Sequence, residues 1–349
     1  MTDLSDYDYE LPRELIAQQP AAQRDDARML VVDRQRQALS HWRVRDLADL
    51  LRPADCLVLN ESRVVPARLV GRRAETGGRW QGLFVEADAV GRWLVLCTAR
   101  GRLRPGEWIE LAAPAASDDL RLQLVERLPD GSWLARPDSA DPPHVVLERV
   151  GHVPLPDYIR GGAMQPADAA RYQTVYAGTP GSVAAPTAGL HFTRELLDRL
   201  AARGLATALV TLHVGLGTFR PIRTDTLAEH VMHREAACVS PLAVDMIAAR
   251  RAAGGRVVAV GTTSVRALES AAAPTGQLQA WEGQTELFIR PGHTFRVVDA
   301  LLTNFHLPRT TLLVLVSTFG GLELMRHAYA EAIRERYRFY SYGDAMLIV

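Results

Sequence analysis

The sequence of 349 residues contains no lysine, because all 40 of its basic residues are arginine. Enzymes that form a Schiff base, attach pyridoxal phosphate or use the lysine of a phosphate-binding P-loop are therefore excluded. A bias in genomic base composition is the simpler cause of this absence, and the chemical consequence does not depend on the cause. The 40 acidic residues cancel the basic ones, so any nucleic-acid surface must be local.

Cysteine, targeting signals and long apolar runs are scarce as well. The three cysteines, Cys56, Cys97 and Cys238, lie far apart without a CxxC pair, which excludes a disulfide framework and a site made of thiolates alone. No apolar run approaches the roughly 20 residues of a membrane span. The acidic start, MTDLSDYDYE, lacks the basic region of a signal peptide. We expect a cytoplasmic protein of ordinary globular composition, without a membrane partner and long enough for two domains.

Several strand-like apolar runs end in turns rich in His, Thr, Ser, Asn and Gly, and a fourth polar stretch, Pro186–Thr193, opens a helix. Open α/β sheets bind ligands beyond the carboxyl ends of their strands, where loops meet helix N-termini. The pattern therefore predicts one composite pocket and an enzyme. The runs are Ala208–Leu212, Val257–Val260 and Asp299–Leu302, and the turns that follow them are His213–Phe219, Gly261–Arg266 and Thr303–Pro308.

The texture of the sequence changes twice. The first stretch predicts a helix over Pro12–Gln19 and strands over Met29–Val32 and Cys56–Leu59. Between Ala67 and Val150, short β-like runs alternate with Gly, Pro and Asp turns, which is typical of a small antiparallel barrel or sandwich. The β-like runs are Arg68–Ala74, Gly82–Val85, Trp93–Cys97, Trp108–Leu111, Leu120–Val125 and Trp133–Ala135.

After Tyr158 the pattern alternates between helix and strand. We expect a helix that Thr193 caps and Gly204 ends, helices near Ala243–Ala253, Val265–Ala272 and Leu322–Arg336, and a terminal strand Ala345–Val349. The predicted fold is α/β, with a mixed-sheet main domain interrupted by an inserted small β-barrel. The predicted domains are residues 1–62 and 151–349 for the main domain and 63–150 for the barrel.

Each motif also has a plain structural explanation. A glycine turn without a ligand would explain HVGLGTF, and N-capping by Thr263 or Ser264 would explain GTTSVR. His230 and His233 form an HxxH motif near Glu235 and Cys238 that could bind zinc from one face of a helix. Because HExxH is absent and no cysteine has metal-ligand spacing, we expect no metal.

Two arginine-rich segments are candidates for RNA contact. One surrounds Arg63–Arg73, and the other, RERYRFYSYGD at Arg334–Asp344, interleaves arginine with aromatic residues. Arginine beside aromatic rings suits stacking on unpaired bases and contact with phosphates. A solvated helix end that runs into a packed strand would explain the second segment equally well.

Taken together, these segments resemble the bacterial S-adenosylmethionine:tRNA ribosyltransferase-isomerase family of queuosine biosynthesis. The resemblance runs through the whole chain in one order, although Glu61-Ser62 stands where the family usually carries Asp-Thr. The matching stretches are DYDYELPRELIAQQP (Asp6–Pro20), NESRVVPARLVG (Asn60–Gly71), GHVPLPDYI (Gly151–Ile159), RYQTVYA (Arg171–Ala177), GSVAAPTAGLHFT (Gly181–Thr193), TLHVGLGTFRPI (Thr211–Ile222), GTTSVRALES (Gly261–Ser270), LTNFHLPRTTLLVLVSTFGG (Leu302–Gly321) and YRFYSYGDAMLI (Tyr337–Ile348).

The resemblance implies an α/β domain with an inserted β-barrel, and it implies a reaction. The ribosyl part of S-adenosylmethionine is transferred to 7-aminomethyl-7-deazaguanine at the tRNA wobble position and isomerised, giving epoxyqueuosine-tRNA, adenine and methionine. S-adenosylmethionine is then a consumed co-substrate and no cofactor is needed. The implied partner is a tRNA with a GUN-type anticodon that carries the precursor base, and the implied state is a monomer.

Our hypothesis gives the chemistry to the loops at the strand ends. His191 or His213 accepts a proton, and His306 acts as an acid or an orienting group. We expect the substrate-binding residues to be Thr187, Gly189, Gly215, Gly217, Thr262, Thr263, Ser264, Arg266 and Asn304, among which Arg266 is the counter-charge to the methionine carboxylate. We expect the tRNA-binding residues to be Arg63, Arg68, Arg72, Arg336 and Arg338. The alternatives are another S-adenosylmethionine enzyme, such as a methyltransferase, and a non-catalytic tRNA-binding protein.

Overall fold

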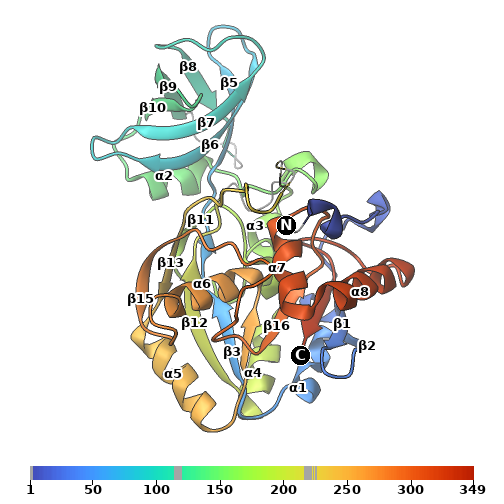
Figure 1. Cartoon of the computed structure of the whole chain (residues 1–349). Coiled ribbons are helices and arrows are strands. Elements are labelled where there is room, and N and C mark those ends of the chain that lie inside the picture. Colours follow the sequence, from blue (N-terminus) through green and yellow to red (C-terminus); the bar gives the residue numbers. More distant parts are fainter. Residues whose placement is uncertain (1–2, 114–119, 216–221, 223, 225) are drawn as a thin grey trace. The chain divides into compact units, whose positions relative to one another are not determined.

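A computed structural model describes residues 3–113, 120–215, 222, 224 and 226–349 of the chain. The chain divides into two compact units (Figure 1). The first unit comprises Met1–Arg63, Pro156–Gly161 and Arg171–Val349, and the second comprises Val64–Leu155 and Gly162–Ala170. The predicted fold class, a mixed-sheet α/β unit with an inserted β-barrel, is confirmed.

The first unit is built on a nine-stranded sheet in the order β15-β13-β12-β3-β14-β16-β17-β1-β2. Its central strands β12, β3, β14 and β16 run parallel, whereas β17 runs antiparallel to β16. Parallel strands that are covered on both faces carry continuous apolar runs, and every residue of β3 and β14 is buried. The strands are β1 (Arg28–Asp33), β2 (Ala38–Arg43), β3 (Cys56–Asn60), β12 (Ala206–Leu212), β13 (Glu235–Val239), β14 (Val257–Val260), β15 (Trp281–Thr285), β16 (Ala300–Asn304) and β17 (Ala345–Ile348).

Helices cover both faces of this sheet (Figure 1). Because successive side chains of a strand alternate between faces, Cys56 and Val58 belong to the apolar cluster that includes α5 to α8, whereas Leu57 and Leu59 belong to the cluster that includes α1 and α4. The helices are α1 (Leu47–Leu50), α4 (Arg194–Ala202), α5 (Pro241–Ala252), α6 (Thr262–Ala272), α7 (Thr311–Gly320) and α8 (Leu322–Arg334), with short 3₁₀ turns η1 (Leu4–Tyr7), η2 (Arg13–Leu15), η3 (Arg24–Asp26), η4 (Val44–Asp46), η5 (Arg160–Gly162) and η6 (Thr187–His191).

The second unit is a closed antiparallel barrel in the order β10-β7-β6-β5-β8-β9. Its apolar cluster includes Trp80, Trp93 and Trp133, each at most 3% exposed, so three indoles help to fill the barrel interior. The elements are β5 (Arg68–Arg73), β6 (Arg79–Ala87), β7 (Trp93–Ala99), β8 (Trp108–Leu111), β9 (Leu120–Arg127), β10 (Trp133–Pro137) and the helix α2 (Pro143–Val150). The remaining elements are α3 (Asp168–Arg171) and the ladder of β4 (Arg63–Val64) with β11 (Pro180–Ser182).

The structure differs from the sequence-based prediction in one wrongly predicted helix and in several elements that were not predicted. The predicted helix over Pro12–Gln19 is wrong, because only Arg13–Leu15 turns and Ile16 bridges to Phe339 in another segment. The helix α7 was not predicted because TLLVLVSTFG is apolar all round and mostly buried, which removes the amphipathic period. The strands β2 and β15 at the two edges of the sheet, the strand β13 beside β15 and the helix α2 were also missed.

Candidate active site at the carboxyl ends of the strands

The carboxyl ends of β14 and β16 open into a cavity of the α/β unit. Gly261 ends β14 with φ +87°, a conformation that favours glycine, and α6 begins at Thr262. The cavity encloses about 620 Å³ with open solvent included. The lining residues are 158, 185–188, 214, 261–263, 303–307, 310, 312, 340 and 341.

Two lining side chains carry polar atoms that no described residue satisfies. The Thr263 Oγ1 and the Tyr340 hydroxyl are both buried without a hydrogen-bond partner among the described residues. An unsatisfied buried polar group costs about 1–3 kcal/mol, so these atoms indicate a site that a ligand completes. Tyr340 also has φ +72°, which is a strained backbone conformation for a bulky residue. Such backbone strain is concentrated at functional sites. Burial raises the pKa of Tyr340, which keeps its hydroxyl protonated and able to donate.

Asn304 joins three segments of the chain at the end of β16. Its Oδ1 accepts a hydrogen bond from the Thr187 hydroxyl at 2.9 Å. Its Nδ2 donates to the Tyr340 carbonyl at 3.2 Å and to His191 Nε2 at 3.3 Å. This network assigns Nε2 of His191 as the acceptor, and burial lowers the pKa of His191 to about 4. His191 is therefore neutral at pH 7 and holds Asn304 from behind the cavity wall.

His306 lines the cavity itself. Its Nε2 lies 2.8 Å from Thr303 Oγ1, and its backbone N–H donates to the Tyr329 hydroxyl at 2.9 Å. Burial lowers the pKa of His306 to about 3, so the ring is neutral at pH 7. A neutral imidazole does not repel a cationic substrate, and the Thr303 contact leaves Nδ1 as the ring nitrogen that a ligand can meet.

The other predicted residues of these loops that the structure describes lie outside the cavity lining. His213 Nδ1 is 2.7 Å from the Ser62 Oγ, and burial lowers the pKa of His213. The Gly215 N–H donates to Glu235 Oε1 at 2.9 Å, and Gly189 packs so closely on Tyr176 that a Cβ would lie 2.0 Å from its hydroxyl. Gly217 lies outside the described residues.

Ser264 and Arg266 do not fit the role that we predicted for them. The Ser264 hydroxyl donates to the Val260 carbonyl at 2.7 Å, one turn back in α6. Arg266 is 3% exposed, forms an ion pair with Glu235 and donates to the Leu287 carbonyl at 3.1 Å. Neither residue borders the cavity. The guanidinium of Arg266, which we predicted to balance the charge of the methionine carboxylate, is paired with Glu235 instead.

Comparison with known proteins shows the family to which the chain belongs. The sequence model of a family described as "Queuosine biosynthesis protein" matches residues 4–348. The chain belongs to this family. The S-adenosylmethionine:tRNA ribosyltransferase-isomerase of Pelobacter propionicus is 50% identical over 347 residues, covering 99% of both chains. That of Azoarcus is 51% identical over 345 residues, covering 99% of this chain and 97% of the relative.

A solved structure extends the match to three dimensions. The crystal structure of the S-adenosylmethionine tRNA ribosyltransferase of Thermotoga maritima superposes with a TM-score of 0.56 at 35% identity, covering 99% of this chain and 100% of the other. The predicted family is therefore confirmed, and so is the prediction of an enzyme of the transferase-isomerase class. The residues that act remain a hypothesis.

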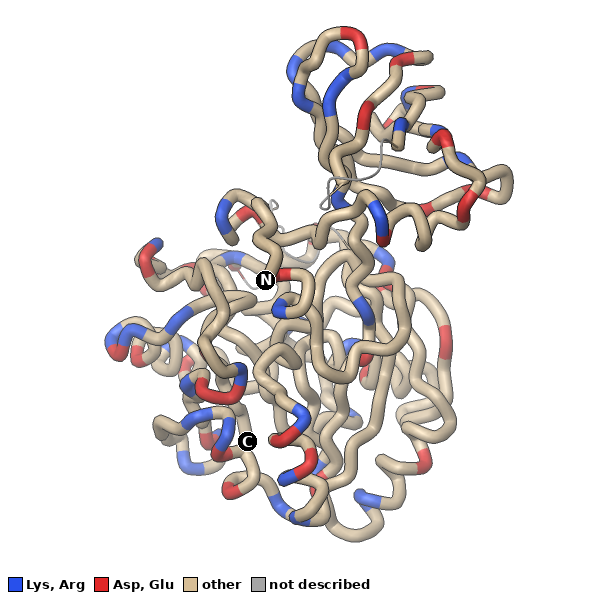
Figure 2. The backbone as a smooth tube through the Cα atoms, turned by 180° about the vertical axis from the view of Figure 1, so that it is seen from behind, with Lys and Arg blue, Asp and Glu red and all other residues tan. Residues whose placement is uncertain are grey.

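The arginines that we predicted as tRNA contacts of this family member differ in how free they are. Arg63, Arg72 and Arg336 are exposed. Arg68 donates to the Gly162 carbonyl and to Gln81 Oε1 at 3.1 Å, and Arg338 donates to the Gln19 carbonyl. Charges of both signs are interspersed along the outer segments of each unit (Figure 2).

The aromatic residues of the second arginine segment pack inside the protein. At most 6% of each residue's surface is exposed, so stacking of these rings on RNA bases is excluded in this conformation and the packed alternative holds. The rings are those of Tyr337, Phe339, Tyr340 and Tyr342.

The metal alternative gains no support from the described residues. His230 and His233 lie in an irregular segment before β13 and not on a helix. No group of three or more His, Cys, Asp or Glu within residues 3–113, 120–215, 222, 224 and 226–349 is arranged to hold a metal ion. None of the described helices is long and apolar enough to cross a bilayer.

Sequence reasoning missed Tyr340 and Ser341 as cavity residues. YRFYSYGD was part of the family resemblance, which was the available signal. Its aromatic residues were considered as an RNA surface, with a packed strand as the equal alternative. In the structure, the Tyr340 carbonyl accepts a hydrogen bond from Asn304 at the end of β16, and Tyr340 lines the cavity.

Proposed function

We propose that this protein transfers and isomerises the ribosyl part of S-adenosylmethionine onto 7-aminomethyl-7-deazaguanine in tRNA, releasing adenine and methionine and giving epoxyqueuosine-tRNA. The names of the full-length relatives support the substrates S-adenosylmethionine and tRNA. The observation that carries the proposal is the cavity at the ends of β14 and β16, with its unsatisfied Thr263 and Tyr340 hydroxyls. We propose the tRNA to be one with a GUN-type anticodon and the enzyme to act as a monomer.

The proposed chemistry begins at the sulfonium of S-adenosylmethionine. The positive sulfur acidifies the C5′ protons, and removal of one proton lets the ribose ring open and adenine leave. The aminomethyl nitrogen of the deazaguanine then attacks, and a later alkoxide displaces methionine as the epoxide closes. The protein must provide a proton acceptor, a donor to the departing adenine and a site that excludes water.

The geometry supports a division of these tasks. His306 Nδ1 is the nitrogen best situated to meet a bound substrate, and we give it the proton transfer. Tyr340 and Thr263 present unused hydroxyls that can donate to the leaving base or to ribose. We propose that His191 is a positioning residue because it reaches the cavity only through Asn304. Its ring is neutral, like that of His306, so neither histidine repels the cationic substrate.

The decisive experiment incubates the protein with S-adenosylmethionine labelled in its adenine ring and with tRNA that carries the precursor base. Free adenine and free methionine in equal amounts support the proposal. S-adenosylhomocysteine in place of adenine would identify a methyltransferase. Binding of tRNA without any turnover would identify a non-catalytic RNA-binding protein. A tRNA that lacks the precursor base is the control, with no adenine expected.

The exposed arginines are the candidates for contact with the tRNA substrate. An anticodon loop presents unstacked bases, and its backbone phosphates attract local positive charge. We propose that Arg63, Arg72 and Arg336 contact the phosphates, with Arg68 and Arg338 nearer to structural roles because their side chains hold backbone carbonyls. Affinity for tRNA should then fall steeply with salt, and a flat salt response would contradict this assignment.

A further inference from the structure

The carboxylate of the proposed co-substrate lacks the partner that the sequence predicted. Arg266 is buried in an ion pair with Glu235, so its charge is compensated before any ligand arrives. A carboxylate that enters a partly buried site needs a positive or hydrogen-bonding partner to replace water. Among the described residues that line the cavity at the ends of β14 and β16 there is no arginine, and the one histidine, His306, is neutral at pH 7.

A second, smaller cleft of the same unit borders this cavity. Ser341 lines both spaces, and His191, which lines the small cleft, is hydrogen-bonded to Asn304 of the cavity. The small cleft encloses about 290 Å³ with open solvent included. Its walls bring together Arg24, Arg171, His191 and Tyr342 from segments far apart in the chain.

The two arginines of the small cleft are close enough to repel each other. Burial lowers the pKa of Arg24 first, and the charge of Arg171 lowers this pKa further. No Asp or Glu is among the described residues that line the cleft. Two guanidinium groups that share a partly buried space without a carboxylate in its walls produce a positive potential that favours an anion.

The hydrogen bonds of Arg171 leave part of its guanidinium unused. Its two terminal nitrogens donate to the carbonyls of Ala21 and Ala22, the latter at 3.2 Å, and these neutral acceptors do not compensate the charge. The buried Arg171 Nε has no partner among the described residues. Arg24 donates to the Leu190 carbonyl at 3.1 Å, next to His191. Both side chains are thus held in position and oriented by backbone carbonyls.

We propose that Arg24 and Arg171 form the subsite for the carboxylate of S-adenosylmethionine, with the sulfonium and ribose in the adjoining cavity. This inference rests on the proposed function. The planar forks of two guanidinium groups match a planar carboxylate, and the half-buried space is small. A backbone phosphate of RNA would bring two further nucleotides with it and would need an open groove. The neutral His191 between the two spaces adds no charge of its own.

The test is adenine release from precursor-bearing tRNA, with kcat/KM measured for S-adenosylmethionine and for its decarboxylated analogue. The wild-type enzyme should prefer the carboxylated substrate on the order of 10- to 100-fold, as expected for charged hydrogen bonds. This arm requires no variant. Arg24→Gln and Arg171→Gln should each lose a similar factor with S-adenosylmethionine and little with the analogue, mainly through KM. Arg203→Gln, which removes an exposed arginine paired with Asp49, is the matched control.

The outcomes separate the inference from the proposed function. Wild-type adenine release without preference for the carboxylated substrate overturns the subsite and leaves the function standing. Variants that lose both substrates equally show a structural role and also overturn it. Variants with an unchanged KM for S-adenosylmethionine and a raised KM for tRNA identify a phosphate site instead. Absence of adenine release from the wild-type enzyme is the failure of the proposed function itself.

Discussion

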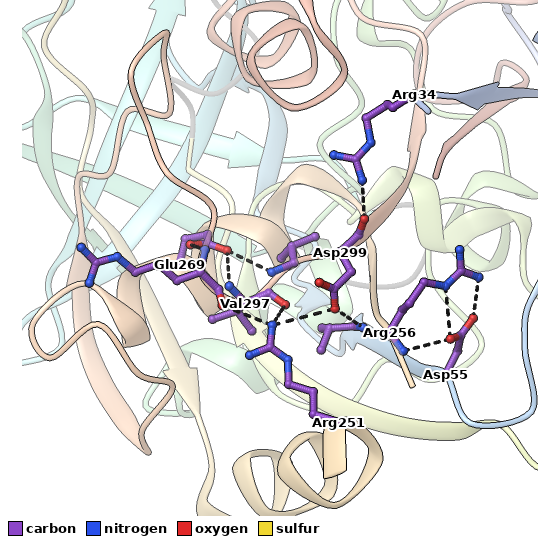
Figure 3. A network of polar contacts seen from close by, with 10 residues as sticks. Arg34, Asp55, Arg251, Arg256, Glu269, Val297 and Asp299 are labelled. Atoms are coloured by element: carbon purple, nitrogen blue, oxygen red, sulfur yellow. Dashed lines mark hydrogen bonds and ion pairs between the residues drawn. The ribbon is translucent and has the colours of Figure 1, made fainter. Parts of the chain in front are cut away.

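The two ends of the parallel strands differ in how completely their polar groups are satisfied. At the amino ends, Asp55 before β3 accepts hydrogen bonds from the backbone and side chain of Arg256, and Asp299 before β16 accepts the Val257 N–H at 2.8 Å (Figure 3). At the carboxyl ends, Thr263 and Tyr340 leave buried hydroxyls without partners among the described residues. The polar groups at the amino ends therefore stabilise the fold, whereas the unsatisfied groups at the carboxyl ends are typical of a binding site.

The helix α6 runs between the two ends of the strands and carries satisfied polar groups near one end and an unsatisfied one near the other. It begins at the cavity with Thr262, and near its other end Glu269 accepts the backbone N–H groups of Arg296, Val297 and Val298 (Figure 3). A buried carboxylate with three such donors is fully satisfied and fixes the loop before β16. The same helix therefore fixes the loop before β16 near one end and presents the unpaired hydroxyl of Thr263 at the other.

The largest contrast should appear when one residue of each end is changed. His306→Gln keeps the size and polarity of the side chain but removes the titratable nitrogen. Because general acid–base catalysis contributes about 10²- to 10⁴-fold, we expect kcat for adenine release to fall by that factor. The midpoint of urea unfolding at pH 7 should change little. Full activity in this variant would remove His306 from the proposed chemistry.

Asp55→Ala is the complementary change at the amino ends. It leaves Arg256 partly buried without its carboxylate, which costs about 3–5 kcal/mol of the free energy of unfolding. Burial raises the pKa of Asp55, but the hydrogen bonds from Arg256 and Arg52 outweigh it and hold this pKa below its ordinary value. Urea unfolding measures the loss, and the folded fraction should retain its kcat.

Asp49→Ala is the matched control for that change. The Asp49–Arg203 and Asp55–Arg256 pairs have the same N–O distance of 2.7 Å, but the Asp49 side chain is 68% exposed and that of Asp55 is fully buried. Exposed pairs contribute about 0–1 kcal/mol, so Asp49→Ala should cost no more than that. Equal losses in the two variants would show that burial does not distinguish the pairs.

The sequence predicted the satisfied end of the sheet less well than the unsatisfied one. Turns of Thr, Asn, Gly and His at three strand ends were visible as motifs, and Thr187, Thr262, Thr263, Asn304 and His306 do line one cavity. The ion pairs of the other end were invisible because Asp55 and Arg256 are 201 positions apart. No local pattern announces a partner at that distance.

Arg266 shows the limit of reasoning from position. It follows a hydroxyl-rich turn at a helix start, which is where a counter-charge to an anion belongs. Glu235 on strand β13, next to the edge strand β15, forms an ion pair with Arg266, however, and β13 was not recognised from the sequence. Arg24 and Arg171 had the reverse problem, because each lies in an ordinary polar stretch and only the fold brings them together.

The pH dependence of stability should belong to the cavity end. His191 and His306 have pKa values of about 4 and about 3 in the folded state, against an ordinary 6.5. As the pH falls, these two histidines take up protons in the unfolded chain before they do so in the folded protein. Their contribution to the free energy of unfolding is therefore complete above pH 6.5 and is lost as the pH drops towards 4. We expect each histidine to contribute on the order of 1–3 kcal/mol to this loss.

Urea unfolding at pH 7 and pH 4.5 tests this contribution. His191→Gln should reduce the difference between the two pH values, and so should His306→Gln. His327→Gln, at an exposed position on α8, should leave the difference as in the wild type. An undiminished difference in both buried variants would mean that carboxylates alone cause the acid sensitivity.

The smallest expected effect is the sharpest test of the comparison between the two ends. Thr263→Val replaces a hydroxyl that has no partner among the described residues with a methyl group of the same shape. Stability should stay within about 1 kcal/mol of the wild type or rise slightly, whereas kcat/KM for S-adenosylmethionine should fall about tenfold. Thr318→Val makes the same replacement in α7, where the hydroxyl donates to the Val314 carbonyl at 2.8 Å. There the order should reverse, with about 1 kcal/mol of stability lost and turnover unchanged, because that hydroxyl is already satisfied within the fold. If both variants lost stability and neither lost activity, the unpaired hydroxyl of Thr263 would have no ligand to bind.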